Sequence, residues 1–214
     1  DMYFATMKTN RNLFIIFGTT RGLGKALLRQ VLLDNDNDVI LVNRSEQIIQ
    51  KDNKNIIKNF VIDLSIPLRQ TKISIFLSAL PLNKKYKNIF FIGNAASIKP
   101  IKPAGEMTIA EINSIFFTNI LNYAALINAF IKKISKLKKS NKKILMISSG
   151  AADSPHHGLS LYCATKAALE MFVRSLFVEQ QTRKEIKILA VRPGVLDTTM
   201  QTLLRNSSRR NFTK

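Results

Sequence analysis

Short apolar runs alternate with longer segments of helical period along most of the chain. The apolar runs have the length of strands and lie at 13–17, 39–42, 56–62, 89–92, 144–147 and 186–191. The segments of helical period lie at 22–33, 66–80, 108–138 and 160–181. Runs that are apolar without alternation are typical of strands covered on both faces, as in parallel sheets. The pattern therefore predicts repeated β-α-β units in a doubly wound, parallel α/β domain of Rossmann type.

The same pattern gives the expected domain organisation. We expect a single domain at 12–204, an N-terminal tail at 1–11 and a basic C-terminal tail at 205–214. The segment Ile112–Ile131 carries no charge, and about 20 such residues could span a bilayer. Its six Ser, Thr and Asn side chains disfavour a membrane-spanning helix. We expect instead a helix buried on several sides, against its own sheet and a second subunit.

Composition narrows the class of partner. The chain has 33 Lys and Arg against 14 Asp and Glu, a formal net charge of +19, and seven lysines fall within 132–143. No aromatic residues interleave with these lysines, so a solvated helix end is favoured over a surface for acidic partners, and no specific nucleic-acid partner is expected. No grouping of His, Cys, Asp or Glu has metal-ligand spacing. The single Cys163 and the absence of an apolar leader in the first residues favour a cytoplasmic protein.

A glycine-rich turn follows the first predicted strand and opens directly into a helix. Its sequence is Gly18-Thr19-Thr20-Arg21-Gly22-Leu23-Gly24. Glycines allow the backbone to turn tightly and to approach a pyrophosphate, which the free N–H groups of a helix N-terminus bind. The position of this turn at the head of a β-α-β unit predicts a dinucleotide site.

The end of the second predicted strand indicates which dinucleotide binds. A carboxylate there would bind the ribose 2′-hydroxyl of NAD, but the chain has Asn43 and Arg44. Arg44, together with Arg21 in the glycine turn, could pair with a 2′-phosphate through charge-assisted hydrogen bonds. These residues favour NADP(H).

Tyr162 and Lys166 are four residues apart in a predicted helix, so their side chains share one face. Reduction of a carbonyl needs an acid that protonates the oxygen as hydride arrives, and an isolated Tyr, with a pKa near 10, exchanges protons slowly at neutral pH. A neighbouring ammonium favours tyrosinate and lowers that pKa. The pair is therefore a candidate for general acid catalysis.

Six motifs together resemble the short-chain dehydrogenase/reductase family, over roughly residues 12–200. In chain order they are the glycine turn Gly18–Gly24, Asp63-Leu64 after the third strand, Gly93-Asn94-Ala95-Ala96 after the fourth, Asn119 in the long helix, Ser148-Ser149 with Tyr162-Cys163-Ala164-Thr165-Lys166, and Arg192-Pro193-Gly194-Val195-Leu196-Asp197-Thr198. The segment at 93–96 differs from the family pattern at two of its four positions. The segments 158–169 and 194–201 look like the sepiapterin reductase and benzil reductase branch.

The resemblance implies a role for each matching residue, and Asp63-Leu64 would contact the adenine. It implies a catalytic set of Ser149, Tyr162, Lys166 and Asn119, in which Asn119 would hold a water that supplies protons to Lys166. Ser149 is chosen over Ser148 because it lies thirteen residues before Tyr162. The cofactor would contact Gly18, Thr20, Arg21, Gly22, Leu23, Gly24, Asn43, Arg44, Asp63, Leu64, Asn94, Ala95, Tyr162, Lys166, Pro193, Gly194, Val195 and Thr198.

We therefore expect an NADPH-dependent short-chain oxidoreductase that reduces a ketone or vicinal dicarbonyl and assembles as a homodimer or homotetramer. A 3-oxoacyl-carrier-protein reductase-like enzyme and a non-catalytic NADP-binding sensor or scaffold are the alternatives. The polar residues after the sixth predicted strand show no pattern for the last strand and helix of the family, so we expect both to be missing here.

Overall fold

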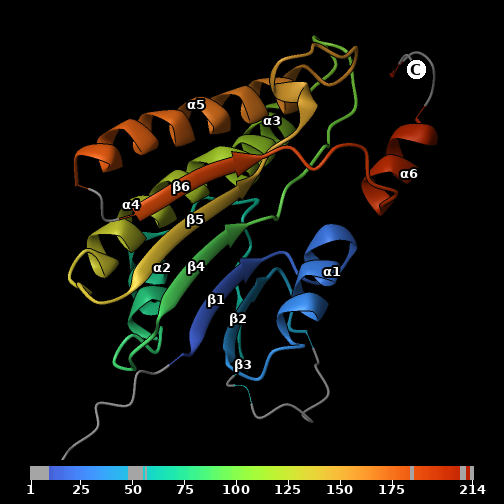
Figure 1. Ribbon diagram of the computed structural model, residues 1–214. Coiled ribbons are helices and arrows are strands. Elements are labelled where there is room, and N and C mark those ends of the chain that lie inside the picture. The colour runs from blue at the N-terminus through green and yellow to red at the C-terminus, as the bar shows by residue number, and fades with distance from the viewer. Residues whose placement is uncertain (1–9, 48–54, 56, 184–185, 208–210, 213–214) are drawn as a thin grey trace, which may run out of the picture.

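A six-stranded parallel sheet forms the centre of the molecule (Figure 1). The computed structural model describes residues 10–47, 55, 57–183, 186–207 and 211–212. The strands are β1 (Asn12–Phe17), β2 (Asn37–Asn43), β3 (Ile57–Val61), β4 (Asn88–Gly93), β5 (Asn141–Ile147) and β6 (Ile186–Val191). They lie in the order β3-β2-β1-β4-β5-β6, and every neighbouring pair is parallel. The predicted doubly wound α/β fold is confirmed.

Helices cover the two faces of the sheet unequally (Figure 1). α2 (Gln70–Ser78), α4 (Asn122–Ile134) and α5 (Ser160–Arg183) lie on one face, and α3 (Ile109–Phe116) leads into α4. α1 (Gly22–Val31) packs on the other face, against β1, β2 and β4. A short last helix, α6 (Thr199–Arg205), follows β6, and no seventh strand occurs among the described residues. The sequence pattern did not predict α6.

The long apolar helix is part of the core. The stretch Ile109–Ile134 is long and apolar enough to cross a membrane. However, Leu126, Ile127 and Phe130 are fully buried in the main hydrophobic cluster, which also contains strand residues. The helix is also interrupted by one turn of π-helix at Phe117–Leu121. The helix is therefore buried against its own sheet, as expected.

The ends of the chain are only partly described. Residues 1–9 of the predicted N-terminal tail lie outside the described residues, as do residues 208–210 and 213–214 of the predicted C-terminal tail. Within the second tail, Phe212 packs against the cluster that contains Tyr162. A side chain at Gly158 would place its Cβ 1.6 Å from the carbonyl oxygen of Asn211. The described end of the chain therefore lies beside the loop that precedes α5.

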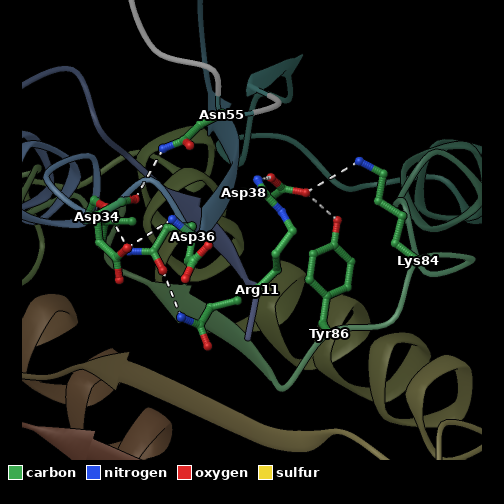
Figure 2. Close-up of polar contacts among 10 residues, drawn as sticks. Arg11, Asp34, Asp36, Asp38, Asn55, Lys84 and Tyr86 are labelled. Carbon is green, nitrogen blue, oxygen red and sulfur yellow. Dashed lines mark hydrogen bonds and ion pairs between the residues drawn. The ribbon is translucent and has the colours of Figure 1, made fainter. Parts of the chain in front are cut away.

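A buried carboxylate, Asp38, ties together three segments at the amino end of the sheet (Figure 2). It accepts hydrogen bonds from the Arg11 guanidinium and, at 2.7 Å, from the Tyr86 hydroxyl, and Lys84 lies 3.6 Å away. Burial raises the pKa of this carboxyl, but the hydrogen bonds from Arg11 and Tyr86 outweigh burial and the net pKa is lowered. Asp38 is therefore charged at neutral pH.

Replacement of Asp38 by Ala should destabilise the fold by about 1–3 kcal/mol, because the buried Tyr86 hydroxyl loses its acceptor. A carboxyl whose pKa is depressed by folding adds stability above its unfolded pKa, and that stability is lost as the pH falls through the folded value. The wild-type protein should therefore lose more stability below about pH 4 than Asp38→Asn does. Urea unfolding at neutral and acidic pH measures both effects, and equal acid sensitivity of the two proteins would contradict the assignment.

Candidate active site

The glycine turn after β1 depends on glycine both for its backbone conformation and for its close contacts. Gly18 has φ +79°, in the left-handed region. A Cβ at Gly24 would lie 1.8 Å from the carbonyl oxygen of Gly18 and 2.5 Å from Nδ2 of Asn94. Asn94 itself donates a hydrogen bond of 2.7 Å from Nδ2 to that Gly18 oxygen. The loop after β4 is therefore fastened to the glycine turn.

The N-terminus of α1 has the form of a phosphate site. Its N-cap residue is Arg21, and no side chain caps the first turn of the helix. The first N–H groups of a helix have no partner within the helix, and together with the helix dipole they favour an anion. Thr20 and Arg21 are exposed beside this turn. The residues present thus fit the pyrophosphate of a dinucleotide.

Asn43 at the end of β2 is buried, and its side chain supports the glycine turn. Its Oδ1 accepts a hydrogen bond of 2.8 Å from the Thr19 backbone N–H, and its Nδ2 donates to Thr19 Oγ1 at 2.9 Å. Gln47 Oε1 lies 2.7 Å from the same hydroxyl. Thr19 and Gln47 were not among the predicted site residues. Its place inside the glycine turn was the only signal for Thr19.

Arg44 and Asp63 lie at the carboxyl ends of neighbouring strands. Arg44 is exposed, and its positive charge contributes to the pKa of Asp63. Burial raises the pKa of Asp63, but hydrogen bonds from the N–H and hydroxyl of Ser65, at 2.8 and 2.7 Å, together with Arg44 lower it overall. This edge of the site therefore offers a charged carboxylate beside an exposed guanidinium.

Asn122, the first residue of α4, holds the loop that follows β3. Its Nδ2 donates to the carbonyl oxygens of Leu64 and Ile66, at 2.9 and 2.8 Å, and its Oδ1 accepts from the Leu68 N–H at 3.0 Å. Asn122 thus fixes the backbone of the predicted adenine contact at Asp63-Leu64. This role was not predictable, because Asn122 is one of several asparagines in the long helix.

Asn119 lies in the π-helical turn and is 1% exposed. Its Oδ1 accepts a hydrogen bond from the Ser97 backbone N–H at 2.8 Å. Its Nδ2 donates to the Ser97 carbonyl oxygen at 2.8 Å and to Thr165 Oγ1 at 3.0 Å. π-helical turns occur frequently at functional sites. Asn119 therefore connects the loop after β4 with α5, one residue before Lys166.

Tyr162 and Lys166 face the carboxyl end of the sheet from α5, and both are buried. Lys166 Nζ donates to the Ile147 carbonyl oxygen at 2.8 Å and lies 5.8 Å from the centre of the Tyr162 ring. Burial lowers the pKa of Lys166 to about 8, against a raising effect of Glu170. Burial also raises the pKa of Tyr162, and a hydrogen bond with Ser149 only partly offsets it. The structure therefore does not show the lowered tyrosine pKa that the sequence suggested, and it keeps Tyr162 protonated at neutral pH.

The two serines after β5 face different partners. Ser149 lies beside the Tyr162 hydroxyl, and its Oγ accepts a hydrogen bond of 3.3 Å from the Ala151 N–H. Ser148 is buried, and its hydroxyl donates to Glu170 Oε1 at 2.7 Å. Of the two, only Ser149 is placed to contact an atom bound at Tyr162.

Apolar side chains from the end of the chain cover Tyr162. Met200 Sδ lies 4.0 Å from its hydroxyl oxygen, and Leu203, Leu204 and Phe212 belong to the same cluster. The wall beside the candidate acid is therefore apolar and comes from α6 and the residues after it.

The loop after β6 approaches the glycine turn. A Cβ at Gly22 would lie 3.3 Å from Cγ2 of Thr198, which is the N-cap residue of α6. In the loop between β6 and Thr198, Gly194 has φ +75° and Val195 is 84% exposed. The fold thus brings the predicted glycine, adenine, Tyr162 and Pro193-Gly194 segments to the carboxyl end of one sheet, where doubly wound folds bind their ligands.

Comparison with known proteins gives matches over nearly the whole chain. The family model described as short chain dehydrogenase matches residues 12–209. A benzil reductase ((S)-benzoin forming) of Bacillus subtilis is 30% identical over 201 residues, which cover 94% of this chain and 81% of the relative. Sepiapterin reductase of Rattus norvegicus is 28% identical over 207 residues, covering 91% and 78%. The crystal structure of the KRED1-Pglu enzyme superposes with a TM-score of 0.80 at 25% identity, covering 94% and 82%.

Proposed function

The chain belongs to the short-chain dehydrogenase family, and we propose that it is an NADPH-dependent carbonyl reductase acting on ketones or vicinal dicarbonyls. The observation that carries this proposal is the joint placement of Ser149, Tyr162 and Lys166 at the same end of the sheet as the glycine turn. The bound nicotinamide supplies the hydride. The protein supplies the oxygen-binding hydroxyl groups, the proton and the walls that exclude water.

Each catalytic residue has one task in this proposal. Ser149 and Tyr162 hydrogen-bond the carbonyl oxygen, and Tyr162 gives its phenolic proton to the oxygen as the carbon is reduced. Lys166 binds ribose and, as an ammonium, stabilises the tyrosinate that is left. Asn119, which Ser97 and Thr165 hold in place, binds the water that supplies protons to Lys166. This division of tasks agrees with a tyrosine that starts protonated.

The cofactor contacts are proposed at the positions described above. The amides of the glycine turn and α1 hold the pyrophosphate, Asp63 and the Leu64 backbone contact the adenine, and Asn94-Ala95 and the segment from Pro193 to Thr198 enclose the nicotinamide side. Arg44 and Arg21 bind the 2′-phosphate. The free thiol of Cys163 and the use of NADPH suit the reducing cytoplasm, where we place the protein.

The walls of the site favour an apolar substrate. Met200, Leu203 and Phe212 offer no charge near the Tyr162 hydroxyl. The carboxylates of the neighbouring loops, Asp153 and Asp197, are already paired with Arg192 and Arg205. A polar pterin edge would lack an ionic partner worth roughly 1.5–3 kcal/mol, whereas an aromatic diketone needs none.

We therefore expect kcat/KM with NADPH to be higher for benzil-like diketones than for sepiapterin. Steady-state rates on the two substrates side by side measure this preference. A matched variant, Met200→Glu, should lower the rate on the diketone more than that on sepiapterin. A wild-type preference for sepiapterin would refute the apolar-wall argument.

A second copy of this chain is proposed to cover the outer face of α5. Met171 and Val178 lie seven residues apart on α5 and are 59% and 63% exposed, and Phe177 is 46% exposed. In contrast, Leu169 and Leu176 of the same helix are buried in the core. Several large apolar side chains exposed on one helix are typical of an interface.

Light scattering at micromolar concentration should give the mass of a homodimer or homotetramer. Replacing Met171 and Val178 with Lys should reduce the assembly to a monomer, while Lys139→Asp, an exposed change elsewhere, should not. A wild-type monomer would contradict the proposed interface.

A further inference from the structure

Glu170 is a buried carboxylate to which the proposed mechanism gives no part. It lies on α5 one helical turn beyond Lys166, and its side chain is 9% exposed. A buried carboxylate without partners would be costly, so its contacts indicate what it holds in place.

The contacts of Glu170 reach two loops of the candidate site. The Ser148 hydroxyl donates to Oε1 at 2.7 Å, from the end of β5. The Arg192 guanidinium donates from Nε to Oε1 at 2.6 Å and from a second nitrogen to Oε2, from the end of β6. Arg174, which is 65% exposed, lies 3.5 Å from Oε2. The paired contact with Arg192 is the bidentate geometry that gives an ion pair its directional strength.

These partners adjoin residues that the mechanism uses. Ser148 precedes Ser149, and Arg192 precedes Pro193 and Gly194. The Lys166 ammonium donates a hydrogen bond to the carbonyl oxygen of Ile147, the residue before Ser148. One carboxylate therefore joins the chain beside the oxygen-binding serine, the start of the nicotinamide loop and the helix that carries Tyr162 and Lys166.

We propose that Glu170 is a positioning residue that fixes the loop after β6 and the Ser148-Ser149 segment relative to Lys166. The proposal rests on the proposed reductase function. The loop needs such an anchor, because Gly194 adopts a left-handed conformation and Val195 is 84% exposed, with few contacts of its own. Arg192 is the point at which this loop is fixed to α5.

The charge of Glu170 also acts on Lys166. Burial lowers the Lys166 pKa to about 8, and the Glu170 carboxylate opposes this effect. The other charged groups around Glu170 are Arg192, Arg174 and Asp153, the last of which also pairs with Arg192. Loss of the Glu170 charge removes this opposing effect, so the pKa of Lys166 should fall further.

The test compares Glu170→Gln with Arg174→Gln. Glutamine keeps the shape and can still accept from Ser148, but it lacks the charge that binds Arg192. We expect kcat to fall about 10- to 100-fold in Glu170→Gln, as for small displacements of reacting groups, and the alkaline limb of the kcat profile to move to lower pH. Arg174→Gln removes only the exposed partner and should match wild type in both readouts.

Two further measurements separate positioning from simple destabilisation. Hydrogen exchange of the amides at 194–198 should be about 10- to 100-fold faster in Glu170→Gln, since a hydrogen bond to a charged group is lost. Arg192→Lys keeps the charge but not the paired contact, so it should speed this exchange without moving the alkaline limb. A merely structural role would lower thermal stability and leave the pH profile in place.

Unchanged kcat, pH profile and loop exchange in a folded Glu170→Gln would overturn the proposal. If the wild-type protein reduces no carbonyl compound, the proposed function fails separately. The exchange rates of residues 194–198 still decide whether Glu170 fixes the loop, because that measurement needs no turnover.

Discussion

Tyr162→Phe should lower kcat by about 10²- to 10⁴-fold, the usual contribution of a general acid. The phenyl ring keeps the packing against Met200 and Leu203, so the fold should not change. NADPH affinity should also be nearly preserved, because the ribose contact of Lys166 remains. The rate on a diketone and the dissociation constant of NADPH, measured on the same preparation, check the two expectations together.

Cys163→Ala provides the matched control for Tyr162→Phe. Cys163 is the next residue on α5, half-buried, and its Sγ lies 3.7 Å from the Ser154 carbonyl oxygen rather than at the Tyr162 hydroxyl. It should retain wild-type kcat. A Tyr162→Phe enzyme with wild-type kcat on a confirmed substrate would show that another group supplies the proton.

Arg44→Asp should abolish or reverse the preference for NADPH over NADH. The guanidinium is exposed at the end of β2, where it can bind a 2′-phosphate, and a charge-assisted contact of this kind is worth roughly 1.5–3 kcal/mol. NADPH affinity should therefore fall by about 10- to 100-fold. NADH affinity should rise, because the new carboxylate can accept from the ribose 2′-hydroxyl.

Titration of both cofactors into wild type and Arg44→Asp measures these affinities. Lys139→Asp makes the same change of charge in the turn before β5, at the opposite end of the sheet, and controls for the general loss of positive charge. Equal affinity of the wild-type protein for NADPH and NADH would contradict the assignment of Arg44 and Arg21 to the 2′-phosphate.

The strands and most helices were predictable because their signals are local. Mainly apolar runs marked all six parallel strands, although Lys58, Asn59 and Lys187 interrupt two of them. The long helix was identified as buried despite its length. Boundaries were less accurate. β2 begins at Asn37 rather than Val39, because the polar residues at its start break the apolar pattern. The second helix begins at Gln70 rather than near residue 66, because the apolar Ile66 and Leu68 belong to the loop that Asn122 holds.

The contacts that support the candidate site were not predictable in this way. Asn43 was expected to face the cofactor, and the structure also uses its side chain to hold Thr19. The pairing of Glu170 with Arg192 joins residues 22 positions apart in the chain. Such contacts depend on how α5 packs on the sheet, which composition and periodicity do not reveal. α6 was not predicted, because seven residues are too few to show a clear helical period.

Oxidation of NADPH by the wild-type protein, coupled to formation of the alcohol from an aromatic vicinal diketone, tests the proposed activity most directly. We expect one molecule of alcohol for each NADPH oxidised. The rate should be much lower in Tyr162→Phe, and also much lower when NADH replaces NADPH. Tight binding of NADPH without turnover of any ketone or dicarbonyl would contradict a reductase and indicate a protein that binds the cofactor without catalysis.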